Sequence, residues 1–364
     1  MGDFLKIAVF SRWNATCGVS LHAELLVRVW VKSGIKVDVY APIVDESIDW
    51  HHKKIDLEDE PWVHRVYRES IWGPKGGSID FNEIDYDHDI VLVESYPHLP
   101  YKEIATVLRK FKDFAKIFVV IHEGRRYDTI NLATFIDIVD RVIVFDFRFI
   151  SEVLADYFES IKDKISIIPY PILDRTTESL ERKKKRQFGE DGIILFSYGR
   201  QPTDEYRDYI KIARKLYNDY GFKIRYKIMR SDDLINGLDD PWIEQWHERP
   251  PAERIYDYLI SSDIHLLPKG KTNNTVVSST VYQSLSSLTP TIAPATRHFE
   301  LLPEDEDGVG PIVKYRNFID LEYKLVRMIK DEDFRGRVIQ EAIKYVKERN
   351  HEKIAKEFLN LFQT

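Results

Sequence analysis

The sequence contains almost no cysteine and no long apolar run. Cys17 is the single cysteine among 364 residues, which excludes an internal disulfide framework and a cysteine-rich zinc site. The apolar stretch Leu5–Phe10 is followed at once by polar residues, so we expect no signal-peptide core there, and no other run approaches the length of a membrane span. These absences indicate a chain that works in the reducing cytoplasm.

Excess positive charge is also missing. The formal net charge is −7, which argues against binding of nucleic acid by the whole surface, and we expect no specific nucleic-acid partner. The basic run Arg182–Arg186 can contact nucleic acid or anionic lipid, but a solvated face is the simpler interpretation. The composition, 43% hydrophobic and 31% charged, is that of a folded soluble protein.

The length and the apolar pattern predict two α/β domains. A chain of 364 residues exceeds the size at which one hydrophobic core usually stops growing. Short apolar strands alternate with helical patterns in both halves, and this alternation predicts two doubly wound, Rossmann-like domains that face each other across a cleft. The expected parts are an N-terminal domain at 1–172, a linker at 173–191, a second domain at 192–347, and a C-terminal helix at 348–364 that packs back on the first domain.

The segment Lys271–Pro294 is rich in hydroxyls and amides and lies between two apolar runs, Asp263–Pro268 and Thr291–Ala293. This order predicts a strand, a loop, a helix and another strand, and ligands of such units bind outside the carboxyl ends of the strands. Serine, threonine and asparagine at a helix start can offer hydroxyls and backbone N–H groups to a phosphate. The same residues are also ordinary helix caps, so both interpretations stay open.

Several short strings occur in an informative order along nearly the whole chain. They are Cys17–Leu25, Ile168–Ile172, Tyr198–Arg200, Tyr258–Ile264 and Leu288–Ala293. Together they resemble the retaining glycosyltransferases of the GT-B fold, especially family 4 with its glycogen synthase and mannosyltransferase relatives. The resemblance implies a nucleotide diphosphate sugar as donor, with UDP or GDP expected, transfer with retention of configuration, and no metal or other cofactor.

The resemblance also implies a donor site, from which this chain departs at the central signature. The family's two glutamates fall on Thr275 and Gln283, so neither carboxylate is present. Gln283 can still hydrogen-bond a ribose hydroxyl, because an amide both donates and accepts. The family's diphosphate arginine matches Arg200, whereas its lysine falls near Glu205, with Arg207 as the nearest basic residue. The remaining implied donor contacts are Gly18, Ser278, Ser279, Thr280 and Glu300.

In the first domain, the strand Ile117–Ile121 leads directly into His122 and Glu123. A histidine after this strand resembles the one that the family places near the reacting sugar carbon, and we expect His122 and Glu123 to be catalytic. Arg125 and Arg126 follow, and they either hold an anionic acceptor such as a lipid phosphate or form a solvated loop. Glu94 and His98 occupy a similar edge one strand away and are weaker candidates.

The leading hypothesis is a glycosyltransferase whose acceptor is a glycan, a lipid or a protein glycan, with contact to a membrane surface as a further expectation. One alternative keeps the GT-B architecture without catalysis, as a nucleotide- or glycan-binding protein whose missing glutamates mark lost activity. Another is a nucleotide-sugar epimerase, for which Glu123 is a candidate acid or base. A dehydrogenase is disfavoured, because neither half carries Gly-x-Gly-x-x-Gly after its first strand.

Overall fold

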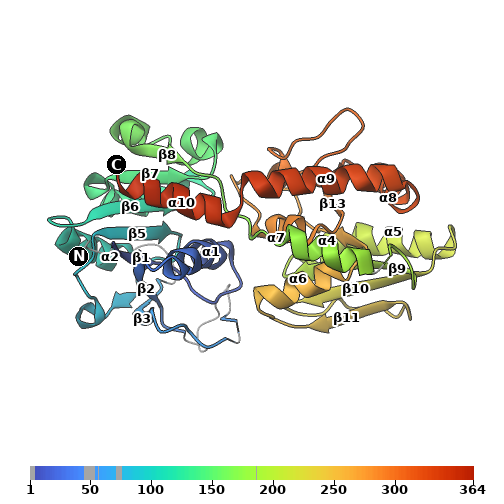
Figure 1. The fold of residues 1–364 in the computed structure, drawn as a ribbon, viewed down its shortest axis with the longest axis horizontal. Helices are drawn as coiled ribbons and strands as arrows, with labels where there is room; N and C mark the ends of the chain where they lie inside the picture. The colour runs from blue at the N-terminus through green and yellow to red at the C-terminus, as the bar shows by residue number, and fades with distance from the viewer. Residues whose placement is uncertain (1–4, 45–53, 56, 71–75, 186) are drawn as a thin grey trace. The chain divides into compact units, whose positions relative to one another are not determined.

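The computed structural model describes residues 5–44, 54–55, 57–70, 76–185 and 187–364. Arg186, the last residue of the basic run, lies outside the described residues. The protein is a mixed α/β structure with two Rossmann-like units (Figure 1). The first unit comprises Met1–Pro171, Asn274–Val277 and His351–Thr364, and the second comprises Ile172–Asn273 and Ser278–Asn350.

In the described part of the chain, the first unit is built on an eight-stranded sheet with the order β4-β3-β2-β1-β5-β6-β7-β8. Neighbouring strands are parallel except for the antiparallel pair β3 and β4. Every residue of β5 is buried, and so is all but the first of β1 and of β6, as expected for strands covered on both faces. The strands are β1 (Lys6–Phe10), β2 (Lys36–Pro42), β3 (Val63–Arg68), β4 (Ser78–Ile79), β5 (Ile90–Ser95), β6 (Lys116–Ile121), β7 (Arg141–Val144) and β8 (Ile165–Ile167).

The helices of the first unit include the C-terminal one. The helix α10 lies beside α1 (Figure 1): the indole Nε1 of Trp30 donates to the Ala355 carbonyl oxygen at 3.0 Å, and the rings of Trp30 and Phe362 are 5.6 Å apart. None of the described helices is both long enough and apolar enough to cross a membrane. The α-helices are α1 (Gly18–Lys32), α2 (Tyr101–Phe111), α3 (Phe158–Ile161) and α10 (His351–Phe362); short 3₁₀ helices cover Phe81–Glu83, Arg126–Thr134, Ile136–Ile138 and Lys162–Lys164, and a π-helix covers Phe149–Val153.

The second unit contains a six-stranded, wholly parallel sheet with the order β11-β10-β9-β12-β13-β14. Residues 173–191, which the sequence predicts to be a linker, contain the helix α4, and the Ser179 hydroxyl donates to the Ser286 carbonyl oxygen within this unit at 3.1 Å. The strands are β9 (Ile193–Gly199), β10 (Ile224–Arg230), β11 (Ile243–His247), β12 (Ile264–Leu266), β13 (Thr291–Pro294) and β14 (Val313–Tyr315). The helices are α4 (Thr176–Lys185), α5 (Arg207–Asn218), α6 (Ala252–Ile260), α7 (Ser279–Ser287), α8 (Phe318–Lys330) and α9 (Glu332–Glu348), with 3₁₀ turns at Thr203–Tyr206 and Arg297–Phe299.

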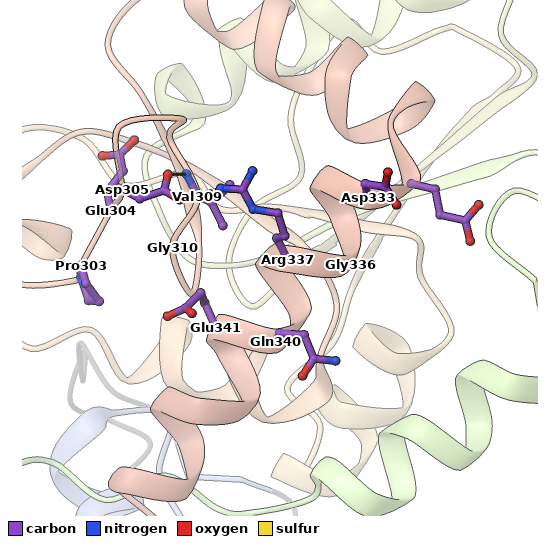
Figure 2. A pocket seen from close by; sticks show the side chains of 11 residues that line it. Pro303, Glu304, Asp305, Val309, Gly310, Asp333, Gly336, Arg337, Gln340 and Glu341 are labelled. Atoms are coloured by element: carbon purple, nitrogen blue, oxygen red, sulfur yellow. Dashed lines mark hydrogen bonds and ion pairs between the residues drawn. The ribbon is translucent and has the colours of Figure 1, made fainter.

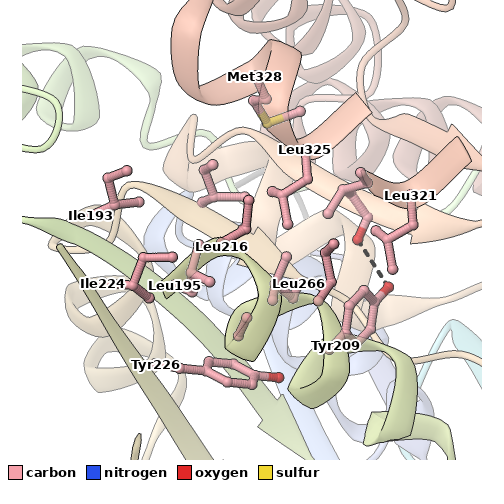
Figure 3. Packing of buried hydrophobic residues seen from close by; sticks show 14 of the residues in the cluster. Ile193, Leu195, Tyr209, Leu216, Ile224, Tyr226, Leu266, Leu321, Leu325 and Met328 are labelled. Atoms are coloured by element: carbon pink, nitrogen blue, oxygen red, sulfur yellow. Dashed lines mark hydrogen bonds between the residues drawn. The ribbon is translucent and has the colours of Figure 1, made fainter. Parts of the chain in front are cut away.

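One apolar core of the second unit lies between its sheet and the helices α5 and α8. Figure 3 shows Leu195 and Leu266 from the sheet packed with Leu216 of α5 and Leu325 of α8. All four side chains are fully buried, and each such burial stabilises the fold by about 1.5 to 3 kcal/mol. This core holds β9 and β12 side by side, and Arg200, which the sequence predicts to bind the donor, directly follows β9.

The strand order reverses within each sheet. In the first sheet β1 has β2 on one side and β5 on the other, and in the second sheet β9 has β10 and β12 as neighbours. Such a switch point separates the two loops that follow adjacent strands, and ligands of open α/β sheets bind there, beyond the carboxyl ends. We therefore expect a ligand site at the loops that follow β1, β5, β9 and β12.

Candidate functional site

A charged cluster lies at the carboxyl edge of the first sheet. Glu94 occupies the end of β5, His122 follows β6, and His22 comes from the first turns of α1. The Nδ1 atom of His22 is 2.8 Å from one carboxylate oxygen of Glu94, and the Nε2 atom of His122 is 2.5 Å from the other. Glu94 and His22 are 0% exposed. The sequence suggested His122 and, more weakly, Glu94, whereas His22 was hidden inside an ordinary helical pattern.

The cluster keeps Glu94 ionised. Burial opposes the charge of Glu94, but His22 and His122 outweigh that effect and lower its pKa to about 2. Burial lowers the pKa of His122, although the hydrogen bond to Glu94 acts in the opposite direction. A buried carboxylate with two histidines on it can hold and orient an imidazole, which is the arrangement that proton-transfer sites use.

Among the described residues, His22, Glu94 and His122 also form a group that could hold a metal ion. Each offers one possible ligand atom, and these three atoms lie within 4.8 Å of one another. Zinc requires nitrogen and oxygen ligands that converge on one point at about 2.0 to 2.2 Å. Here the two oxygens of Glu94 face different histidines at 2.8 and 2.5 Å, which are hydrogen-bond distances. The geometry therefore favours a hydrogen-bonded cluster over a metal centre.

Glu123 points into the first unit. Its Oε1 accepts a hydrogen bond from the Ser95 hydroxyl at 2.5 Å and another from the Tyr101 hydroxyl, while its Oε2 is buried without a hydrogen-bond partner in the described structure. Burial raises the pKa of this carboxyl group. The Glu123 side chain thus anchors the loop that begins at His122. Its raised pKa favours the protonated carboxylic acid, whereas the lowered pKa of Glu94 favours the carboxylate.

The two arginines of this loop are exposed, and each is paired with an aspartate. Arg125 contacts Asp128 through two hydrogen bonds of 2.7 and 2.9 Å, and Arg126 forms an ion pair with Asp156. Such surface pairs are weak and screened by salt. They leave both guanidinium groups on the surface, where an anion would compete with the aspartates.

Gly18 and His98 each have a structural partner within the first unit. Gly18 begins α1, and its carbonyl oxygen accepts a hydrogen bond from the Tyr170 hydroxyl at 2.7 Å. His98, beyond β5, is 2.9 Å through Nδ1 from the Ser70 carbonyl oxygen.

The carboxyl edge of the second sheet carries positive charge. Arg200 follows β9, directly after Gly199, whose φ of +123° suits glycine. Lys269 comes three residues after the end of β12. Burial lowers the pKa of Lys269 to about 8, with Glu205 raising it and Arg200 lowering it further. Burial is the largest of these effects and opposes the charged form of Lys269, which a bound anion would stabilise in addition to Glu205.

Lys269 is a residue that the sequence interpretation missed. The family pattern directs attention to Glu205 and Arg207, yet Arg207 is exposed at the start of α5, while Lys269 interacts electrostatically with Glu205 and Arg200. An ideal Cβ added to Gly270 would lie 2.5 Å from the carboxylate of Glu205, so the two segments are in close contact. The sequence signal that could have identified Lys269 is its position as a charged residue shortly after the buried apolar strand β12.

The helix α7 brings several predicted donor residues together. Ser278 is its N-cap residue, and its hydroxyl oxygen is buried without a hydrogen-bond partner in the described structure. Ser279 and Thr280 occupy its first turn and are half-buried. Gln283 is buried, and its Oε1 accepts a hydrogen bond from the Tyr198 hydroxyl at 2.9 Å. An unbonded hydroxyl at the positive end of a helix can donate to a phosphate oxygen.

Two other predicted donor residues lie apart from this group. Thr275 belongs to Asn274–Val277, which is part of the first unit: its backbone N–H donates to the Gly124 carbonyl oxygen at 2.8 Å and its hydroxyl to Glu152 at 2.9 Å. The range predicted for the second domain therefore contains residues that pack with the first unit. Glu300 is exposed and lies 3.5 Å from Arg297.

A separate pocket of about 910 Å³ lies in the second unit (Figure 2). It lies between the segment Pro303–Gly310 and α9, and its lining includes Glu304, Asp305, Glu332, Asp333 and Glu341. The guanidinium of Arg337 also lines it, but that group is already paired with Asp305 at 2.6 Å and with Asp307 at 3.0 Å. This excess of carboxylates disfavours a diphosphate, and none of the site residues predicted from the sequence lines the pocket.

The two doubly wound sheets define the GT-B class of glycosyltransferase folds. No family model matches the chain. An alpha-glucosyltransferase in complex with UDP and a 13-mer DNA containing an HMU base is similar, with 13% identity, a TM-score of 0.71 and full coverage of both chains. HepE of Anabaena, in complex with UDP and glucose, has 9% identity and a TM-score of 0.63 over 99% of this chain and 100% of that one. The pneumococcal O-GlcNAc transferase GtfA, in complex with UDP and GlcNAc, has 12% identity and a TM-score of 0.63 over 99% of both chains.

Proposed function

We propose that the protein is a glycosyltransferase that moves a sugar from a nucleotide diphosphate sugar to an acceptor. The observation that carries the proposal is the placement of two cations, Arg200 and the partly buried Lys269, beyond the carboxyl ends of the neighbouring strands β9 and β12. A leaving diphosphate gains negative charge as the glycosidic bond breaks, and cations held in place stabilise it. The likeness to GT-B structures that contain UDP supports this choice of ligand.

The donor we propose is a UDP- or GDP-sugar. Arg200, Lys269 and the unbonded hydroxyl of Ser278 would bind the diphosphate, and Gln283 would bind the ribose. Because these groups provide positive charge and hydrogen-bond donors, the reaction we propose needs no metal ion. Retention of configuration follows from the resemblance to family 4 and forms part of the proposal.

The acceptor would bind to the first unit, where His122 has the proton chemistry that a sugar hydroxyl requires. A glycan, a lipid-linked sugar or a protein glycan fits this role. Arg125 and Arg126 would contact an acceptor that carries a phosphate, and a membrane surface would then be a partner.

A thermal-shift screen with UDP, GDP, ADP and CMP tests the donor site, because a ligand that binds only the folded state raises Tm. We expect UDP or GDP to raise Tm, and consumption of the matching nucleotide sugar should then require an acceptor. Proton NMR of the product gives the anomeric configuration. The absence of both a shift and donor consumption would support the non-catalytic binding protein instead, while an altered donor sugar without acceptor would support the epimerase.

A further inference from the structure

The ring of Tyr198 is fixed at the carboxyl end of β9, in the second unit. Tyr198 is the next-to-last residue of this strand and is 5% exposed. Its ring stacks with that of Phe196, with centroids 5.7 Å apart, and with that of His265, with centroids 5.3 Å apart. Close packing of this kind leaves a buried ring little freedom to move. The position of the Tyr198 hydroxyl is therefore set by the core around it.

This hydroxyl reaches two acceptors on the helix α7. The Oε1 atom of Gln283 lies 2.9 Å away, and the carbonyl oxygen of Thr280 lies 3.2 Å away. A phenol has a single proton, and the shorter distance assigns that proton to Gln283. Burial raises the pKa of Tyr198 well above its usual value, so the hydroxyl stays protonated at neutral pH. The amide oxygen of Gln283 is thus turned toward Tyr198.

The amide nitrogen of Gln283 is left for another partner. Its Nε2 atom makes no hydrogen bond with a described residue, and it is not among the buried polar atoms that lack a partner. The Nε2 atom therefore contacts solvent, although the residue as a whole is only 8% exposed. An amide nitrogen carries two N–H donors and does not accept. In this orientation Gln283 offers donors, and not an acceptor, to a molecule that enters from solvent.

We propose that Tyr198 is a positioning residue that orients the Gln283 amide so that Nε2 donates to a ribose hydroxyl oxygen of the donor nucleotide. This inference rests on the proposed function, in which Gln283 binds the ribose. Without the tyrosine hydroxyl, the amide can rotate and present its oxygen as readily as its nitrogen. A site whose polar group is fixed to meet a hydroxyl rejects an analogue that lacks it, because the polar group is then left unpaired.

The contact also joins the two elements that carry the proposed diphosphate ligands. Arg200 follows β9, the strand of Tyr198, and Ser278 is the N-cap residue of α7, the helix of Gln283. A bond between strand and helix at this point holds the ribose contact in register with the diphosphate contacts. The ribose contact can nevertheless be tested separately, because pyrophosphate contains no ribose.

The same unit provides a matched control. Tyr226, on the neighbouring strand β10, is 0% exposed (Figure 3), and its hydroxyl lies 2.8 Å from that of Ser197. Tyr226→Phe therefore removes a buried phenol hydroxyl and its hydrogen bond, as Tyr198→Phe does, without touching Gln283.

The experiment is calorimetric titration of the full-length protein with three ligands: UDP or GDP, whichever raises Tm, its 2′,3′-dideoxy analogue, and pyrophosphate. The wild type should bind the dideoxy analogue about 10-fold or more weakly than the ribonucleotide. Tyr198→Phe should reduce this ratio to about threefold or less by weakening the ribonucleotide, while the Kd for pyrophosphate stays within about twofold of wild type. Tyr226→Phe should keep the wild-type ratio.

A double-mutant cycle tests whether Tyr198 acts through Gln283. Gln283→Met should reduce the ratio as Tyr198→Phe does, and the double variant should lose no more than either single variant, because both changes remove the same contact. Additive losses would overturn the inference. A parallel loss of pyrophosphate affinity in Tyr198→Phe would also overturn it, since the hydroxyl would then only support the helix.

A further measurement uses the wild type and keeps the inference testable if Tyr198→Phe does not fold. The side-chain N–H resonances of Gln283, assigned in ¹⁵N–¹H NMR by their absence from Gln283→Met, should move downfield when the nucleotide binds. Unchanged resonances, or equal affinity of the wild type for the ribonucleotide and its dideoxy analogue, would overturn the inference. A wild type that binds none of UDP, GDP, ADP and CMP would instead refute the proposed function.

Discussion

The carboxyl edges of the two sheets have the same architecture and opposite chemistry. Beyond the first sheet lie a buried carboxylate, Glu94, and two histidines that bind it. Beyond the second sheet lie Arg200, the partly buried Lys269 and Ser278, whose hydroxyl has no hydrogen-bond partner among the described residues. The first edge is suited to moving a proton and the second to holding an anion. The comparison teaches that a few residues at strand ends, and not the fold, set the chemistry of each unit.

Removal of the histidine should produce the largest effect. His122→Ala should lower the transfer rate by about 10² to 10⁴, because the group that receives the acceptor's proton is lost, while the affinity for UDP stays within twofold. Steady-state kinetics and calorimetric titration with UDP measure the two quantities. A parallel loss of nucleotide affinity would contradict the division of labour between the two edges.

Removal of charge from the second edge should have the converse effect. Lys269→Met should raise the Kd for UDP about 10-fold or more, since a hydrogen bond to a charged group contributes about 1.5 to 3 kcal/mol, and Arg200→Ala should act in the same direction. Arg225→Ala is the control, because Arg225 is an exposed cation on the neighbouring strand β10. Equal losses in the control and Lys269→Met would mean that only overall charge matters.

The buried His265 of the second unit should make the stability of the protein depend on pH. His265 is 0% exposed, its Nε2 has no hydrogen-bond partner in the described part of the chain, and burial lowers its pKa to about 3. The unfolded chain therefore binds this proton more readily than the folded protein does, so stability falls as pH decreases below about 6.5 and the loss levels off near pH 3. At pH 5 the expected loss is about 2 kcal/mol.

Urea unfolding at pH 7 and pH 5 measures this loss. His265→Phe removes the titration and keeps a ring against Tyr198, whose centroid lies 5.3 Å away. The variant should lose less stability than the wild type between the two pH values. An unchanged pH dependence would show that other groups control the acid sensitivity.

The smallest effect is expected from the exposed arginines of the first edge. With a phosphate-bearing acceptor, Arg125→Ala should raise the acceptor KM about two- to threefold and leave kcat unchanged, because the guanidinium is already shared with Asp128. An uncharged acceptor serves as the comparison and should show no change. If both acceptors respond equally, the loop acts through its structure and not through charge.

The strands that could be predicted are those whose sequence contains continuous apolar runs. The strands β1, β5 and β6 are buried on both faces, which is why their sequences contain unbroken runs. No residue of the strand β11 is fully buried: Glu244 and His247 are exposed, and the other three are partly exposed. As an edge strand with the sequence Ile-Glu-Gln-Trp-His, it lacks the run that would have identified it.

The candidate site was only partly predictable, for a related reason. His122 could be proposed because it ends a buried strand, and Arg200 because it follows Gly199 at the end of β9. Lys269 was missed because a family pattern placed the second cation after β9, while here it follows β12. Thr275 packs with the first unit through hydrogen bonds to Gly124 and Glu152. Both partners lie more than 120 positions away in the chain, so no local sequence pattern could predict where Thr275 lies.

The sequence by itself determined the α/β class, because the periods of its apolar residues specify which segments become strands and which become helices. It also determined which polar residues follow the buried strands. Only the tertiary structure decided which of them interact: it joined His22 to Glu94 and His122, and it brought Lys269 near Arg200. Those contacts depend on the order of strands in each sheet, which is set by packing between distant segments and not by local sequence.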